Sequence, residues 1–197
     1  MTRWVLAVLV ASCTALASAD SDDLLRRTGN LLDKHAITTG QFIQTATVAA
    51  LNAPLISGGV FYFDRDQGVS WHVDRPISAR FIFRPTATDT RVASAPTMPM
   101  AWIGQMLNAV LAGDFTQLIR QFSIDGSVST EHWALSLTPK SAAFGRAIAK
   151  IEIEGAAAVS RIKVFEANGD DVSIAFSVIE YPDSLPADVE REFEQAH

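Results

Sequence analysis

The chain has 197 residues, of which 48% are hydrophobic, and it carries 16 Lys and Arg against 22 Asp and Glu. The formal net charge of −6 and the lack of any basic run argue against a nucleic-acid partner, because binding to phosphates depends on clustered Lys and Arg. Anionic membrane surfaces are disfavoured for the same reason.

The first residues have the organisation of a removed secretory signal. Arg3 precedes an apolar run that ends near Ala11, and Ala17-Ser18-Ala19 supplies the small residues that a signal peptidase reads. The run is too short to span a membrane, which takes about 20 apolar residues. We therefore expect residues 1–19 to be a signal peptide and residues 20–197 to be one secreted, periplasmic domain.

Cys13 is the only cysteine, and cleavage after Ala19 would remove it, leaving a mature chain without a disulfide. The segment Val10-Ala11-Ser12-Cys13 also resembles a lipobox, which would make Cys13 a lipidated N-terminus. Because only twelve residues precede Cys13, we favour cleavage after Ala19 and a mature chain that starts at Asp20.

The first part of the mature chain predicts a helix followed by strands. Ser21 can cap a helix whose leucines recur on one face, and Gly40 is expected to end it. From Gln41 the pattern shifts to a period of two, with Gln67-Gly68 as a turn between two strands. The side chains expected to share faces of these strands are Phe61 with Phe63, Val60 with Tyr62, and Val69 with Trp71 and Val73. Residues 79–84 and 88–94 predict two more strands.

The middle of the chain interrupts the strand pattern. Residues 101–111 are apolar nearly all round and predict a helix, which Gly113-Asp114 ends. A second, amphipathic helix follows, with its apolar positions at Phe115, Leu118, Ile119 and Phe122.

The last third predicts strands at residues 132–138, 149–154, 160–166 and 172–181. Asn168-Gly169 between the final two is a hairpin signal, because both residues tolerate positive φ. The tail over residues 185–197 is acidic and weakly helical. Strands joined by short turns, with helices but no βαβ alternation, predict an antiparallel α+β fold.

No catalytic or metal-binding motif stands out. The histidines His35, His72, His132 and His197 have no metal-ligand spacing, no G-x-S-x-G is present, and the glycines form no phosphate loop. We expect a protein that is not an enzyme and that needs no metal and no cofactor.

Large apolar side chains are the unusual feature. Met98, Met100 and Met106 cluster in and before the predicted helix, and methionine suits a surface that repacks around varied partners. An apolar pocket could bind an acyl chain with about 0.8 kcal/mol per CH₂ and no polar residues. The alternative is an ordinary core. The candidate ligand-binding residues of the pocket and its lid are Phe61, Phe63, Trp71, Phe81, Phe83, Met98, Met100, Trp102, Met106, Leu107 and Trp133.

Four motifs in order resemble the outer membrane lipoprotein carrier (LolA-like) family. They are Gly40-Gln41-Phe42-Ile43-Gln44, then Gly59 to Phe63, then Arg65 through Trp71 to Pro76, and finally Trp133 to Lys140, which resembles W-x-L-x-L-x-P-K. Asp66 stands where the family has proline, and Arg84-Pro85-Thr86 replaces a family D-G-x-x-x-W pair. The departures indicate a divergent branch.

The resemblance implies a half-open antiparallel β-barrel with a helical lid. It implies a monomeric periplasmic carrier or chaperone that takes acyl chains of a lipoprotein, or of an envelope glycolipid, from an inner-membrane exporter to an outer-membrane receptor. It also implies that Arg65 bonds the lid and controls its opening, although Arg65 could equally be a solvated turn residue. A lipid-sensing regulatory module and an envelope hydrolase remain alternatives.

Overall fold

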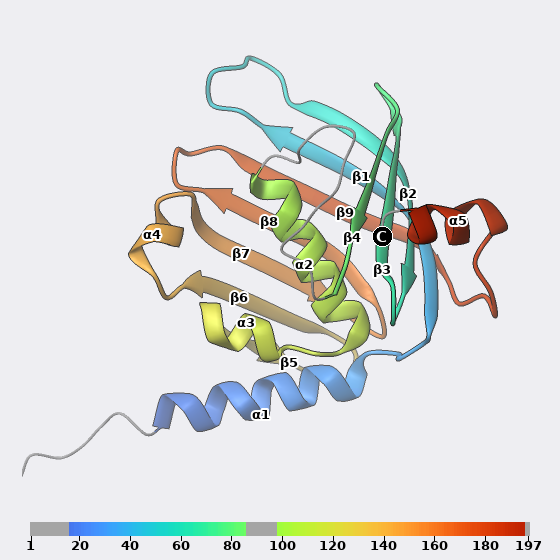
Figure 1. Cartoon of the computed structure of the whole chain (residues 1–197). Helices are drawn as coiled ribbons and strands as arrows, with labels where there is room; N and C mark the ends of the chain where they lie inside the picture. Colours follow the sequence, from blue (N-terminus) through green and yellow to red (C-terminus); the bar gives the residue numbers. More distant parts are fainter. Residues whose placement is uncertain (1–15, 86–97, 196–197) are drawn as a thin grey trace, which may run out of the picture.

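A computed structural model describes residues 16–85 and 98–195 of the chain. In these residues nine strands form one antiparallel sheet in the order β4-β3-β2-β1-β9-β8-β7-β6-β5 (Figure 1). The strands are β1 (Ile37–Thr47), β2 (Leu55–Asp64), β3 (Gly68–Arg75), β4 (Ala79–Phe83), β5 (Phe122–Val128), β6 (Trp133–Pro139), β7 (Ile148–Gly155), β8 (Val159–Glu166) and β9 (Asp171–Glu180). The helices are α1 (Leu16–Leu31), α2 (Met98–Ala112), α3 (Thr116–Gln121), α4 (Ala142–Gly145) and α5 (Ala187–Gln195).

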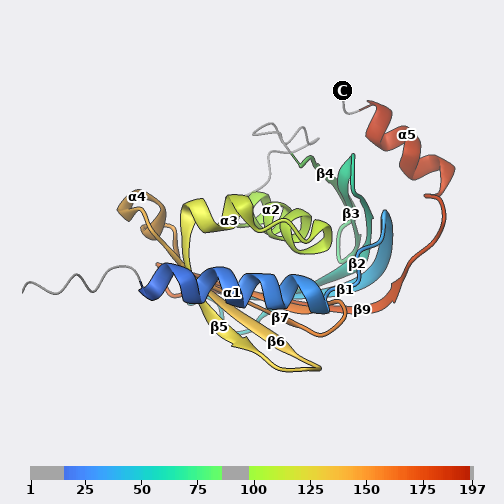
Figure 2. The same cartoon turned by 90° about the horizontal axis from the view of Figure 1, so that it is seen from below.

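The sheet curls without closing, since β4 and β5 are its two edges. Figure 2 shows α2 and α3 inside the curve, α1 along the β5 side and α5 outside the curve near β3. Helix α1 covers the β5 edge with two side-chain bonds: Ser21 Oγ donates to the Ile124 carbonyl at 3.1 Å and Arg27 Nη2 to the Val128 carbonyl at 2.8 Å. The predicted α+β class and half-open antiparallel sheet with a helix over its inner face are confirmed.

Alternation along β2 and β3 separates the two faces as the sequence predicted. Phe61, Phe63, Val69 and Trp71 are buried on the inner face, whereas Tyr62 between the phenylalanines faces outward. The strands predicted near residues 79–84, 132–138, 149–154, 160–166 and 172–181 are present. The helix predicted at 101–111 is also present and runs from Met98 to Ala112. The strand expected at 88–94 lies outside the described residues.

Gly40 does not end the first helix. That helix stops at Leu31, and Gly40 lies inside β1 opposite Phe61. A Cβ at Gly40 would be 2.7 Å from both the Phe61 ring and the Ile179 side chain. The glycine therefore makes room for an aromatic ring at the centre of the sheet, and it plays no part in ending the helix.

The second helix of the middle segment is shorter than predicted. It ends at Gln121, and Phe122 begins strand β5, which we did not predict. Phe122 and Ile124 are buried while Ser123 and Asp125 between them are exposed. This period of two was present in the sequence, but the helical spacing that runs up to Phe122 obscured it.

The predicted turn glycines have the expected positive φ, but Ser21 does not cap the first helix, because α1 begins at Leu16 and Ser21 lies inside it. Gly169 in the Asn168-Gly169 turn has φ +95°, and Gly113 after α2 has φ +67°. Asp114 accepts the Thr116 backbone N–H at 2.9 Å, and hydrogen bonds from Thr116 lower the pKa of the Asp114 carboxyl. Among the described helices, none has the length and apolar character needed to cross a bilayer.

Candidate functional site

Aromatic side chains from four neighbouring strands form the floor of the concave face. Phe42 of β1 stacks on Trp71 of β3 with ring centroids 3.7 Å apart, and Phe61 of β2 lies 6.2 Å from Trp71. Phe176 of β9 meets the rings of Phe61 and Trp71 edge-on at 5.7 and 6.2 Å. The strand order β3-β2-β1-β9 makes these rings neighbours although they are up to 134 positions apart. We call Phe42, Phe61, Trp71 and Phe176 the aromatic floor.

One polar atom of the aromatic floor lacks a partner. Trp71 is completely buried, and its indole Nε1 finds no hydrogen-bond acceptor in the part of the chain that the structure describes. An unsatisfied buried donor costs about 1–3 kcal/mol, so the site carries a donor that an incoming oxygen atom could satisfy.

Helix α2 occupies the space above the aromatic floor. Its sequence has no charged residue, and Ile103, Met106, Leu107 and Val110 are buried against the sheet and its neighbours. The contacts reach β3 and β4 on one side and β8 on the other, so α2 bridges the two halves of the curved sheet. The concave face is therefore filled by the protein's own helix.

Helix α2 and the end of strand β4 meet closely. Asn108 Nδ2 donates to the Phe83 carbonyl at 3.1 Å and to the Gly104 carbonyl at 3.0 Å. A Cβ at Gly104 would lie 2.2 Å from Phe83 Cγ, so only glycine allows this approach without a shift. Phe83 also stacks on the half-buried Phe81, with ring centroids 6.3 Å apart.

Most of the predicted ligand-binding residues come together here, but not all. The predicted residues that share this region are Phe61, Phe63, Trp71, Phe81, Phe83, Met106 and Leu107. Trp133 is buried at the start of β6, where its Nε1 donates to the Ala156 carbonyl at 2.7 Å, several strands away from the aromatic floor. Met98, Met100 and Trp102 belong to the first turns of α2, and their side chains lie outside what the structure describes.

Among the described residues, the hydrogen bonds of Arg65 go to main-chain carbonyls outside helix α2. Arg65 lies in the β2–β3 turn, and its Nη2 donates to the His35 carbonyl at 3.2 Å, while its backbone N–H donates to the Ala36 carbonyl at 2.9 Å. The partner is thus the segment between α1 and β1. An arginine fork does donate to a main-chain carbonyl, as the resemblance implied, but that carbonyl is not on the methionine-containing helix.

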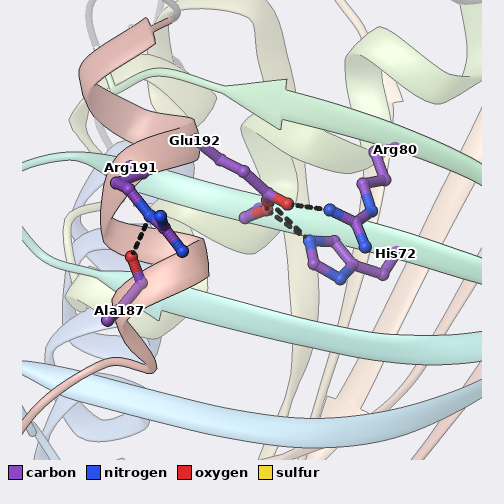
Figure 3. A network of polar contacts seen from close by, with 6 residues as sticks. His72, Arg80, Ala187, Arg191 and Glu192 are labelled. Atoms are coloured by element: carbon purple, nitrogen blue, oxygen red, sulfur yellow. Dashed lines mark hydrogen bonds and ion pairs between the residues drawn. The ribbon is translucent and has the colours of Figure 1, made fainter.

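A polar network on the outer face fastens the C-terminal helix α5 (Figure 3). Glu192 Oε2 accepts Ser70 Oγ at 2.9 Å and contacts His72 Nε2 at 2.8 Å, and Glu192 Oε1 forms an ion pair with Arg80. Arg84, next to the α2 contact at Phe83, donates to the Phe193 carbonyl of α5. The Glu192 cluster and Arg84 tie α5 to β3 and to the end of β4.

Apolar contacts support the same attachment. Leu185, Val189 and Phe193 are buried against Ile37, Tyr62 and Ile82 of the outer face. Burial raises the pKa of the Tyr62 phenol, and the nearby carboxylates of Asp188, Asp74 and Glu192 add to this while Arg80 opposes it. The sequence prediction of a weakly helical tail missed this attachment, although the spacing of four in Leu185, Val189 and Phe193 predicts one buried face.

Ser70, His72 and Glu192 resemble the components of a hydrolytic triad, but their geometry differs. In such triads the acid holds the imidazole nitrogen opposite the one that faces the serine. Here Ser70 Oγ and Glu192 Oε2 both contact Nε2 of His72, at 2.9 and 2.8 Å, and Ser70 is fully buried. The cluster therefore has the geometry of a structural attachment and does not support the hydrolase alternative.

Comparison with known proteins identifies the family. The profile of the outer membrane lipoprotein carrier protein LolA matches residues 34–189, and no curated protein sequence matches the chain. A DUF1329 family protein from Desulfovibrio piger superposes with a TM-score of 0.45 at 12% identity, covering 91% of this chain and 98% of the other. A LolA superfamily protein from Nitrosomonas europaea gives 0.43 at 10%, covering 86% and 96%. A chain of the MucA/MucB complex from Pseudomonas aeruginosa gives 0.46 at 13%, covering 86% and 60%.

Proposed function

This chain belongs to the outer membrane lipoprotein carrier protein (LolA) family, and we propose that it holds the acyl chains of a lipoprotein or envelope lipid between the aromatic floor and helix α2. We propose further that it works in the periplasm after removal of residues 1–19, receives its cargo at the inner membrane and delivers it towards the outer membrane.

The uncharged helix over an aromatic floor is the observation that supports the proposal. Contacts between α2 and the sheet are mainly apolar, and Asn108 adds a polar tether to the end of β4. An acyl chain could replace the α2 side chains with groups of the same polarity, so displacement of α2 would expose no charge to the interior. Each buried CH₂ contributes about 0.8 kcal/mol, or on the order of 10 kcal/mol for a long chain.

The free indole N–H of Trp71 suits the polar end of such cargo. An ester, amide or carboxylate carries a carbonyl oxygen beside its hydrocarbon chain, and that oxygen can accept the Nε1 hydrogen that has no partner in the described residues. A cargo of this chemistry would gain one hydrogen bond in addition to apolar contact.

A reversible lock on α2 tests the proposal. A disulfide between cysteines at positions 83 and 104 would fasten α2 to β4, since a Cβ at Gly104 lies 2.8 Å from Phe83 Cβ and a disulfide needs about 3.8 Å, a small adjustment. Cys13, the only native cysteine, falls in the expected signal peptide. The Phe83→Cys/Gly104→Cys protein should bind a fluorescent fatty acid when reduced and lose that binding when oxidised.

Equal binding in the two redox states would place the acyl chain elsewhere and refute the site. The single variants Phe83→Cys and Gly104→Cys serve as controls, because neither can form the lock. Transfer of bound lipid to acceptor vesicles then separates a carrier, which releases its cargo, from a lipid sensor, which retains it.

A further inference from the structure

Exposed apolar side chains gather at one end of the sheet. Leu51 is 48% exposed, Leu55 56% and Ile56 60%. Ile43 and Ile77 add two more, so five of the eight strongly exposed large hydrophobic residues in the described chain belong to this end. We call these five residues the apolar end.

Strand register places these residues together. β1 and β2 pair from Ile37 with Asp64 up to Ala46 with Leu55, so Leu51 lies in their connecting loop. β3 returns towards the same end, where Arg75 pairs with Gly58, and Ile77 follows in the β3–β4 turn. Figure 1 shows the β1–β2, β3–β4 and β8–β9 connections at this end of the sheet.

The hairpin that carries most of the apolar end has no charge. Residues 36–63 contain no Asp, Glu, Lys, Arg or His. Charged groups beside this hairpin come from its neighbours: Asp170 of the β8–β9 turn accepts the Ala49 N–H at 2.7 Å, Asp171 pairs with Thr47, and the Arg75 side chain of β3 lies close to Gly58. An uncharged apolar tip can enter the interfacial region of a bilayer without desolvating a charge, which is the expensive part of insertion.

We propose that the apolar end docks on a lipid bilayer whose headgroups are neutral overall. The acidic β8–β9 turn and the net charge of −6 would repel an anionic surface, so the attraction is apolar contact and not electrostatic. The exposed leucines and isoleucines supply that contact, as interfacial apolar side chains do in other peripheral proteins. Docking of this kind does not depend on acyl binding under α2.

Flotation of the exported protein with phosphatidylcholine vesicles tests the docking. The Leu51→Asp/Leu55→Asp variant should lower the vesicle partition coefficient about tenfold or more, because a carboxylate opposes insertion. Val178→Asp is the matched control: Val178 is 57% exposed but lies near the Thr39–Glu180 pair, at the far end of β1. This control should bind vesicles like the unmodified protein.

Insertion is measured separately by attaching a fluorophore to Leu51→Cys or to Val178→Cys. Brominated lipids should quench the fluorophore at position 51 and leave the one at position 178 unquenched. Unchanged flotation of Leu51→Asp/Leu55→Asp, equal loss in Val178→Asp, or tighter binding to anionic vesicles would each overturn the proposal. Sedimentation that shows a dimer abolished by Leu51→Asp/Leu55→Asp, without vesicle binding, would assign the apolar end to a second copy instead. All readouts are taken without cargo, so they are unaffected if the acyl-binding proposal fails.

Discussion

The contact between Gly104 and Phe83 allows a quantitative test of how α2 is held closed. In Gly104→Ala the new Cβ would lie 2.2 Å from Phe83 Cγ and 2.3 Å from Cδ1, far inside normal contact. Phe83 is buried, so its ring has little space to retreat. Overpacking of this kind costs about 1–3 kcal/mol in the closed state. The gain in helix propensity, about 1 kcal/mol, applies whether α2 is docked or displaced.

The closed-to-open ratio should therefore fall by about 5- to 150-fold. Hydrogen exchange measures it: amides of residues 98–112 should exchange faster in Gly104→Ala by a factor in that range. Gly145→Ala is the control, because a Cβ at Gly145 of α4 meets nothing within 4 Å. Adding Phe83→Ala removes the two ring contacts and should relieve most of the clash, leaving the Cβ–Cβ approach of 2.8 Å. If α2 exchanges equally fast in Gly104→Ala and Gly145→Ala, the close approach does not hold α2 and the reasoning is wrong.

Four further outcomes are expected. Glu192→Ala should lower the free energy of unfolding in urea by about 1–3 kcal/mol, because buried donors lose their acceptor, whereas Glu190→Ala at an exposed position should not. Trp71→Phe should weaken binding of a fatty acid relative to an alkane of equal length; equal weakening of both would show that only ring volume matters. Arg65→Leu should leave uptake intact and change the rate of lipid transfer by up to about tenfold, and a wild-type rate would make Arg65 a turn residue only. Intact mass of the exported protein should begin at Asp20, and a diacylated N-terminal cysteine would contradict the cleavage site.

Local patterns predicted the elements better than the contacts between them. The period of two at Phe61 and Phe63 and the Asn168-Gly169 turn identified strands and a hairpin that the structure contains. Gly40 was misassigned because the space it leaves is needed by Phe61, a residue 21 positions away. Local sequence alone does not reveal such a requirement.

The polar cluster on the outer face was beyond local reasoning. Ser70 and His72 share the outer face of β3, which alternation predicts, but their partner Glu192 is more than a hundred residues further along. Only the packing of α5 on the sheet brings the carboxylate to them. Met106 and Leu107 are buried, as a helix that is apolar nearly all round requires, while their role in ligand binding stays a prediction.

A concave face filled by α2 has a consequence for the energetics of carriage. Because the interior is already occupied, uptake would be an exchange of one apolar occupant for another, and the measured affinity would be the difference between two large burial terms. Helix α2 would compete with the cargo, so weaker contacts between α2 and the sheet would favour retention of the lipid. Stronger contacts would favour its release. Delivery could then proceed without a nucleotide or any other energy source at the acceptor, since redocking of α2 would itself help to expel the lipid. The protein without cargo would meanwhile expose no open apolar cavity that could promote aggregation.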